Sequence, residues 1–237
     1  MRAAVLLVLL AAPGARAEDA RFEVHLNLMG AWGDLDFADV RAFPILGREI
    51  TAITSYDLDS AVGFDAGVQV NVVGPLGVRA SVSRAVHDGT GLLTAAILPP
   101  IPGLPRSVEA EIPGGQISET AAHLDGVVSG HMGRVRLSAF AGVTFFRLEA
   151  QLLDRVDISF PGGSRIPVIG PPSLEVSDSP TGWNVGVGLE VGVSKLVSVG
   201  GFVRYSQATA HIRPPLSDPI QMEAGGAHTA LGVRLRF

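Results

Sequence analysis

The chain has 237 residues, a formal net charge of −5 and no cysteine. The missing cysteines exclude a disulfide framework, thiolate metal sites and a lipoprotein anchor, and the scattered basic residues are not the footprint of a nucleic-acid-binding protein. Hydrophobic residues make up 47% of the chain and charged residues only 17%. No segment after the N-terminus reaches the roughly 18 consecutive apolar residues of a membrane helix, so the apolar surface must be accommodated in another way, for which a closed β-barrel in lipid is the alternative.

The N-terminus is typical of an export signal. Arg2 supplies the positive charge, residues 5–12 (VLLVLLAA) form a short apolar region, and Ala15-Arg16-Ala17 is a small-x-small cleavage site. The apolar run is far shorter than a spanning helix. We therefore expect residues 1–17 to be a signal peptide that is removed on export, which leaves a single domain of residues 18–237.

Eight later segments alternate apolar and polar residues with period two, which predicts β-strands that have one apolar face. In the clearest of them, Trp183, Val185 and Val187 share one face. Most segments have about 11 to 13 residues, which at about 3.3 Å per residue and a tilt near 40° is enough to cross an outer-membrane hydrocarbon layer. The alternation lies at residues 22–28, 62–72, 78–83, 122–129, 135–145, 183–193, 197–206 and 227–237.

The connections between these segments alternate in length. The tight connections lie at residues 74–76, 132–133 and 194–196. The long ones lie at residues 33–58, 88–118, 149–180 and 211–224. This arrangement predicts an all-β fold, an eight-stranded antiparallel up-and-down transmembrane β-barrel with short periplasmic turns and long extracellular loops. An even number of strands places both termini at the short-turn end.

Residue parity across the tight turns agrees with this pairing. Each expected pair keeps apolar residues on one side of the sheet, which a slip of one residue would destroy. The expected pairs are Val72 with Val78, Gly130 with Val135, and Val193 with Val197.

A soluble, lipocalin-like barrel is the rival fold, because it also alternates, with its apolar residues inward. Three features argue against it. The polar face is small and weakly charged, as at Gly186, Gly188 and Gly192, the loop lengths are strongly asymmetric, and the sequence closes on an apolar strand.

Aromatic residues lie near both ends of the predicted apolar face. We interpret them as two interface belts, because amphipathic rings favour the headgroup region; the alternative is ordinary core aromatics at strand ends. The belt near the long loops would contain Trp32, Phe145, Trp183 and Tyr205, and the belt near the short turns Phe22 and Phe237.

The last segment alternates Leu231, Val233 and Leu235 and ends in Phe237. With this ending, the pattern of about residues 20–237 resembles the small outer-membrane barrels of the OmpA-transmembrane-domain, OmpX and OmpW type. The resemblance implies that the four residues are the signal read by the barrel-insertion machinery. It also implies outer-membrane lipid as a partner and the outer membrane of a Gram-negative-type bacterium as the location.

Two features do not fit the simple pattern. Arg84 falls on the apolar face by parity, where a charge near the midplane costs about 2–4 kcal/mol. Either a β-bulge turns it inward, or the strand sits lower and the side chain reaches the interface. Gly126 and Gly130 also leave the lipid face of their strand poorly covered.

The polar faces of the strands would fill the interior of the barrel, which is just wide enough for side chains. Buried charges must be paired, so we expect Arg79, Arg136 and Arg234 to converge with Glu23 and Glu190 near the periplasmic end. Glu23 would pair with Arg234 or Arg236, and Arg136 with Glu190. We interpret this network as a salt-bridged plug, with a gate or narrow conduction path as the alternative. The lumen set comprises Glu23, His25, Asp65, Arg79, His123, Asp125, Arg136, Glu190, Arg204, His228, Arg234 and Arg236.

His123, Asp125 and Ser129 share one face and could be taken for a hydrolytic set, for instance for lipid A deacylation. Nucleophilic catalysis needs Ser and His within hydrogen-bond reach, whereas His123 and Ser129 lie about 20 Å apart along a strand. We therefore interpret them as lumen filling. The histidines are too dispersed for a metal site and no nucleotide fingerprint is present, so the sequence predicts no enzyme, metal or cofactor.

The long connections are apolar and Pro-rich, as in residues 92–105 (LLTAAILPPIPGLP) and 165–172 (RIPVIGPP). Residues 106–112 and 156–160 could form short strands above the membrane. Either these loops pack as a cap over the barrel mouth, or they bind a small apolar ligand or a surface partner.

The leading hypothesis is a non-enzymatic barrel with a structural or surface-interaction role. The alternative is a narrow porin-like conduit for small hydrophobic molecules, as OmpW-type barrels are thought to be, and a lipid-modifying enzyme is a remote third.

Overall fold

The computed structural model describes residues 21–32, 37–45, 48–96, 107–152, 157–158, 168–169, 174–212 and 220–237. No helix in these ranges is long and apolar enough to span a membrane. The predicted signal peptide, residues 1–17, lies outside the described residues, so its removal stays a prediction.

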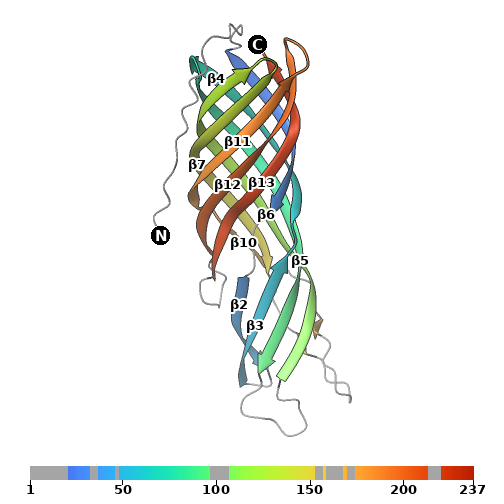
Figure 1. The fold of residues 1–237 in the computed structure, drawn as a ribbon. Coiled ribbons are helices and arrows are strands. Elements are labelled where there is room, and N and C mark those ends of the chain that lie inside the picture. Colours follow the sequence, from blue (N-terminus) through green and yellow to red (C-terminus); the bar gives the residue numbers. More distant parts are fainter. Residues whose placement is uncertain are drawn as a thin grey trace, which may run out of the picture.

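Eight of the described strands close into one hydrogen-bonded antiparallel ring (Figure 1). Each strand pairs with the next one in the ring, and the last closes on the first, which confirms the predicted barrel and its strand number. In ring order the strands are β1 (Phe22–Trp32), β4 (Ala61–Val73), β5 (Leu76–Ala96), β6 (Ser107–Met132), β7 (Val135–Leu152), β11 (Thr181–Gly192), β12 (Val197–Ile212) and β13 (Ile220–Arg236).

The ring is strongly staggered. A path that starts at Phe22 and follows the paired residues once around the barrel returns to β1 at Trp32, ten residues further along. Such a shear for eight strands requires the strands to tilt by about 40° and leaves an interior that side chains fill. The path therefore rises from the short-turn end at Phe22 to the long-loop end at Trp32.

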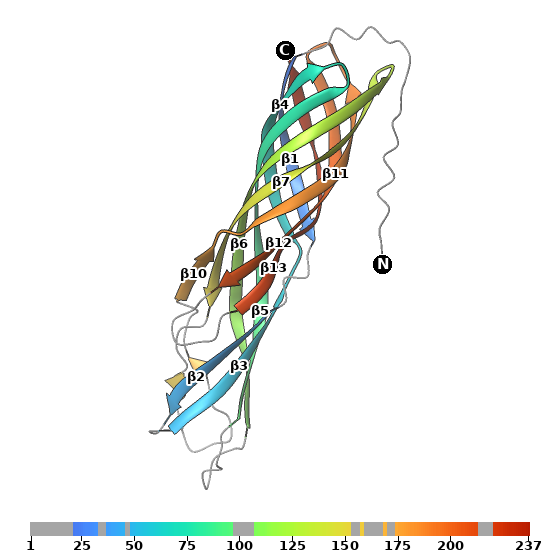
Figure 2. The same cartoon turned by 90° about the vertical axis from the view of Figure 1, so that its left-hand side faces the viewer.

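A four-stranded sheet projects beyond the barrel at the long-loop end (Figures 1 and 2). β2 (Phe37–Ile45) and β3 (Arg48–Leu58) form a hairpin, and β3 pairs with the far half of β5, which in turn pairs with β6 along its whole length. Beside the barrel, β10 (Leu174–Asp178) pairs with the end of β7. β8 (Asp157–Ile158) and β9 (Val168–Ile169) form a separate two-stranded sheet.

The prediction of four long loops is therefore wrong for much of their length. Residues 37–58 are a hairpin, and residues 88–96 and 107–118 continue β5 and β6. Of the short strands expected above the membrane, residues 107–112 belong to β6, and β8 lies within 156–160. Most of the Pro-rich residues at 97–106 and 159–167 lie outside the described residues.

Two of the three expected turn pairings are also wrong. Val78 pairs with Val70, because the register shifts between Asn71 and Val73. Val135 pairs with Met132 across a two-residue turn, which places Gly130 opposite Leu137. The backbone N–H of Val193 does donate to the Val197 carbonyl at 3.0 Å, as expected. The apolar face stays on one side of the sheet in each case, so the errors affect register and not side-chain direction.

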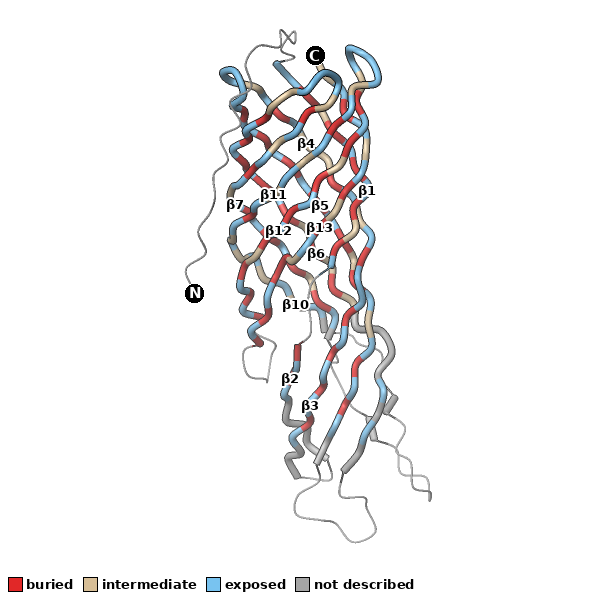
Figure 3. The backbone as a smooth tube through the Cα atoms, in the orientation of Figure 1, coloured by how far each residue is buried: buried red, intermediate tan, exposed pale blue. Residues whose placement is uncertain are grey.

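Buried and exposed residues alternate along the ring strands (Figure 3), but the chemistry of the two faces changes along each strand. Near the short turns, the outward residues are apolar, and Leu26, Val187 and Leu231 each expose more than half of their surface. Nearer the long loops, the outward residues become polar, and the inward residues become apolar. Each such strand thus has one segment whose outer face suits lipid and one whose outer face suits water, without a change in strand geometry.

β7 and β12 illustrate this inversion. On β7, the outward residue Phe145 is followed by the outward Arg147, while the inward residue Leu148 is fully buried. On β12, Tyr205 is followed by Gln207 on the outside, and Ala208 is buried on the inside. We place the outer boundary of the apolar band at this change.

Arg84 stays on the outer face of β5. The pairing of β4 with β5 is regular through the Phe64–Arg84 pair, so no bulge turns this side chain inward. Val82 is the last outward apolar residue before it, and Thr120 of β6 is its other neighbour. Arg84 therefore lies at the outer boundary, which agrees with the second alternative drawn from the sequence.

The interior of the barrel is apolar at the long-loop end. Phe37, Tyr56 and Leu58 of the β2–β3 hairpin pack there with inward residues of β6, β7, β12 and β13, among them Leu148 and Met222. The rings of Phe37 and Tyr56 stack with their centroids 4.7 Å apart. The base of the hairpin thus packs at the mouth of the barrel, and a cap formed by the long loops together stays a prediction.

Gly186→Ala is expected to lower the free energy of unfolding by about 1–3 kcal/mol, because a Cβ at this inward position overlaps the Phe140 ring and the Val203 carbonyl. Gly126→Ala is the matched control, since a Cβ there meets nothing nearer than the Ala141 carbonyl oxygen at 3.9 Å. Urea titration in detergent micelles, followed by tryptophan fluorescence, measures both variants. Equal losses in the two variants would contradict the packing around Phe140.

Candidate functional site: the charged interior of the barrel

The structure places all twelve side chains expected in the lumen inside the barrel, because each lies on the inward face of its strand. Eleven of them are buried, and Arg236, at the end of β13, keeps 17% of its side chain exposed. Their contacts form three levels between the short-turn end and the mouth, which we call the floor, the middle level and the upper level.

The floor crosses the full width of the barrel. Arg136 Nη1 on β7 donates a 2.8 Å hydrogen bond to Glu23 Oε2 on β1, the strand directly opposite in the ring. Arg234 Nε lies 3.2 Å from Glu190 Oε1, and Arg236 Nη2 donates to Glu190 Oε2 at 2.6 Å. Glu23 is also 4.0 Å from Arg234 and 3.4 Å from Arg236, and Arg136 is 3.8 Å from Glu190, so the expected ion pairs are present.

The middle level joins β12 to the far side of the barrel. Arg204 Nη1 donates to Asp65 Oδ2 at 3.3 Å, and Arg204 Nη2 donates to Ser81 Oγ at 3.2 Å on β5, the strand opposite β12. His25 Nε2 lies 3.2 Å from the other oxygen of Asp65. Arg204 is completely buried, so its charge depends on these partners.

Arg79 does not join the floor, and the expectation that it converges with Glu23 and Glu190 is wrong. Its Nε and Nη2 both donate to Asp125 Oδ2, at 3.1 and 2.9 Å. The reason is register, because Arg79 and Asp125 are direct cross-strand partners on β5 and β6. Arg79 therefore belongs to the middle level.

Two phenylalanines support the middle arginines, and the sequence pattern had predicted no role for them. The Cζ atom of Arg79 lies 3.6 Å from the centroid of the Phe140 ring, and that of Arg204 lies 4.7 Å from the Phe202 centroid. The two rings meet edge to face with centroids 6.0 Å apart. A cation over an aromatic face gains most when water is excluded. The signal in the sequence was an aromatic residue on the polar face of two strands.

The upper level is a contact between a carboxylate and the backbone of the opposite strand. Glu119 Oε2 on β6 accepts a 3.0 Å hydrogen bond from the backbone N–H of Gly225 on β13, and Glu119 Oε1 lies 3.8 Å from His228 Nε2. Gly225 has a φ of +99°, which L side chains rarely adopt. The pairing of β13 with β1 ends at Ala227 and Trp32. Beyond this pair, the Glu119 carboxylate accepts the backbone hydrogen bond of Gly225 that a neighbouring strand would otherwise accept. Glu119 was not predicted as a lumen residue, because it precedes the segment predicted as a strand.

The suspected hydrolytic residues do not form a catalytic set. The ring nitrogens of His123 lie 3.1 Å from Ser83 Oγ and 2.9 Å from Thr144 Oγ1. Asp125 binds Arg79, and Ser129 Oγ accepts a hydrogen bond from Arg136 at 3.1 Å. Within the described ranges, no group of three or more His, Asp or Glu side chains is placed to hold a metal ion.

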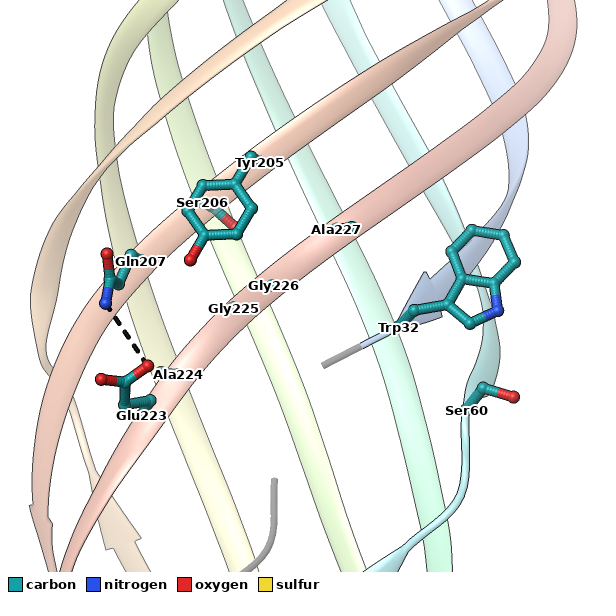
Figure 4. A pocket seen from close by; sticks show the side chains of 10 residues that line it. All are labelled: Trp32, Ser60, Tyr205, Ser206, Gln207, Glu223, Ala224, Gly225, Gly226 and Ala227. Atoms are coloured by element: carbon teal, nitrogen blue, oxygen red, sulfur yellow. Dashed lines mark hydrogen bonds between the residues drawn. The ribbon is translucent and has the colours of Figure 1, made fainter. Parts of the chain in front are cut away.

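A pocket of about 450 Å³ opens in the barrel wall, where β1 ends and β13 continues (Figure 4). Trp32 and Ser60 line one side, and Tyr205 and Glu223 line the other. Glu223 accepts a 3.3 Å hydrogen bond from Gln207 across the rim. The pocket therefore lies at the seam between β1 and β13, near the outer boundary of the apolar band.

The aromatic residues of the expected belts all face outward. Trp183 and Tyr205 lie near the outer boundary with ring centroids 5.7 Å apart, and Phe22 and Phe237 meet at the short-turn end with centroids 6.3 Å apart. Trp32 and Phe145 are likewise exposed. Their role as membrane belts stays a prediction. So does recognition of the outward-facing ending by the insertion machinery, through Leu231, Val233, Leu235 and Phe237.

Comparison with known proteins agrees with this geometry. Residues 2–237 match the family model described as outer membrane protein beta-barrel domain. The solved outer membrane protein OprG from Pseudomonas aeruginosa is similar in fold, with a TM-score of 0.54 and 11% identity over 91% of this chain and 95% of that one.

Two further solved structures are more distant. Neisserial surface protein A has a TM-score of 0.45 and 12% identity over 91% of this chain and 97% of its own. The attachment invasion locus protein Ail of Yersinia pestis has a TM-score of 0.41 and 12% identity over 91% and 98%. No sequence among the curated proteins matches this chain.

Arg204→Met is expected to lower the free energy of unfolding by about 3–5 kcal/mol, because it leaves Asp65 buried without its arginine. Adding Asp65→Asn to this variant should recover part of the loss. Thr209→Ala, an exposed position on the same strand, should change stability by no more than about 0.5 kcal/mol. Urea unfolding in micelles compares the three proteins, and an Arg204→Met as mild as Thr209→Ala would refute the importance of the middle level.

Proposed function

The chain belongs to the family of outer membrane protein β-barrel domains, and from this premise we propose that it is a closed, non-enzymatic barrel that holds a β-sheet outside the cell for surface interaction. The family places the protein in the bacterial outer membrane. The observation that carries the proposal is that side chains bridge opposite walls of the barrel at three levels.

Each bridge joins strands that are four positions apart in the ring of eight. On the floor Arg136 reaches Glu23, in the middle Arg204 reaches Ser81, and on the upper level Glu119 reaches the backbone of Gly225. A water-filled path through so narrow a barrel would have to displace all three contacts. Buried charges that lose a partner are costly, which supports a closed interior and a structural role for the network.

The projecting sheet supports a role at the cell surface. β2 is the last strand in the order of this sheet, so within the described part of the chain one of its edges has no strand partner. The outer face carries Val40 and Ile53, which are cross-strand partners, and Leu92 on the neighbouring β5, all exposed. An unpaired edge and exposed apolar side chains are both features of protein interaction surfaces.

Planar-bilayer recordings test whether the interior is closed. The wild-type protein is expected to give no stepwise conductance, because the three bridges obstruct the lumen. A variant that removes the bridges with their charge partners, Glu23→Ala, Arg136→Ala, Asp65→Ala, Arg204→Ala and Glu119→Ala together, should give transient steps if it inserts. This variant is the positive control, because it shows whether the recording can detect an opened lumen.

Conductance or solute flux through the wild-type barrel would contradict the proposed closed interior. It would favour the second candidate function, a conduit for small hydrophobic molecules. The observation in favour of that candidate is the wall pocket between Trp32 and Tyr205, which offers an apolar molecule a position beside the lipid. A conduit would still need a route past Glu119 and Gly225, which lie inside the barrel at the same seam.

Cysteine labelling on intact cells tests the position of the projecting sheet. The chain has no cysteine, so Ser55→Cys on the exposed face of β3 provides a single reporter. A membrane-impermeant maleimide is expected to label this variant fully. Lys195→Cys, in the exposed turn before β12, should be labelled only after the outer membrane is permeabilised. The opposite pattern would place the sheet in the periplasm and overturn the proposed surface role.

A further inference from the structure

Two arginines point outward from the barrel at the boundary of the apolar band. Arg84 on β5 and Arg147 on β7 are both exposed, and both are cross-strand partners of Thr120, which lies between them on β6. The three residues form one row across three strands. Neighbouring strands lie about 4.8 Å apart, so the two arginine Cα atoms are about 10 Å apart, and their long side chains can reach the same group above Thr120.

The row marks the end of the apolar surface on these strands. Outward residues between the short turns and this row are uncharged, from Leu76 to Val82 on β5 and from Val135 to Phe145 on β7. The eight residue steps from Leu76 to Arg84 cover about 20 Å along the barrel axis at the expected tilt, close to the height of an outer-membrane apolar band. Arg84 is thus at the depth where lipid hydrocarbon gives way to headgroups, and Arg147, two strands further along the rising row, lies on its headgroup side.

Within the described residues, the charge of Arg84 in this row is not balanced by a carboxylate. Arg84 makes no hydrogen bond or ion pair with another residue that the structure describes. Arg147 donates from Nε to Glu149 Oε1 at 2.9 Å, but 67% of its side chain remains exposed. Thr120 is uncharged, so the row is cationic although the whole chain carries a net charge of −5.

We propose that Arg84, Thr120 and Arg147 form a binding site for the phosphate of a phosphorylated lipid in the outer leaflet. A guanidinium group binds phosphate through two parallel N–H donors, and the threonine hydroxyl adds a donor between the two arginines. The neighbouring hydrocarbon lowers the local dielectric and strengthens the attraction. The apolar residues below the row, such as Val82 and Phe145, would contact the acyl chains of the same lipid.

Binding of diphosphoryl lipid A to the purified full chain in dodecyl maltoside micelles, counted by native mass spectrometry, tests the site. The double variant Arg84→Gln with Arg147→Gln is expected to raise the apparent Kd at least tenfold. The matched control, Arg21→Gln with Arg134→Gln, removes the same charge from exposed residues at the short-turn end and should change the Kd less than twofold. Heat-dependent migration on gels verifies that each variant is folded.

A second arm separates phosphate recognition from general lipid affinity. Lipid A stripped of both phosphates should bind the wild-type chain no better than it binds the double variant. Wild-type affinity in the folded double variant, or an equal loss in the control pair, would overturn the proposal. A loss that is just as large with the stripped lipid would also overturn it, because acyl contacts alone would then explain the binding.

Discussion

The change of surroundings along each strand is the constraint on which the rest of this structure depends. A strand that crosses lipid must turn apolar side chains outward, and the ring must close because no backbone group can remain unpaired there. Beyond the lipid, water surrounds the same strand, and apolar side chains are then more stable inside. On β7 the outward side chains change from apolar to charged between Phe145 and Arg147, while the pairing of β7 with β6 continues unchanged.

The polar interior follows from the apolar exterior. An eight-stranded barrel has too little room for bulk water, so every charge turned inward needs a protein partner. Arginine suits this demand, since one guanidinium carries five donors and can contact two walls at once. Arg136 reaches Glu23, Asn71 and Ser129, on three different strands. The network therefore holds opposite walls together while it satisfies buried charge.

The sequence predicted the barrel, the strand number and the inward residues, because these depend on parity, and parity survives small errors in register. It failed where pairing partners or surroundings matter. Arg79 was assigned to the floor, although its direct partner across the sheet is Asp125. Residues 146–152 and 207–212 were left outside the predicted strands, because their alternation is inverted and no longer offers an apolar outer face. Glu119 was missed for the same reason.

The inversion also explains why the outer sheet is not an independent module. β5 is a single strand from Leu76 to Ala96, and β6 runs from Ser107 to Met132, so the sheet is built on strands that begin in the membrane. Whatever fixes the depth of the barrel fixes the height of the sheet above the lipid. Arg84 is the outward residue of β5 at which the strand leaves the apolar band. A lipid phosphate bound there would set both the depth of the barrel and the position of the surface that it presents.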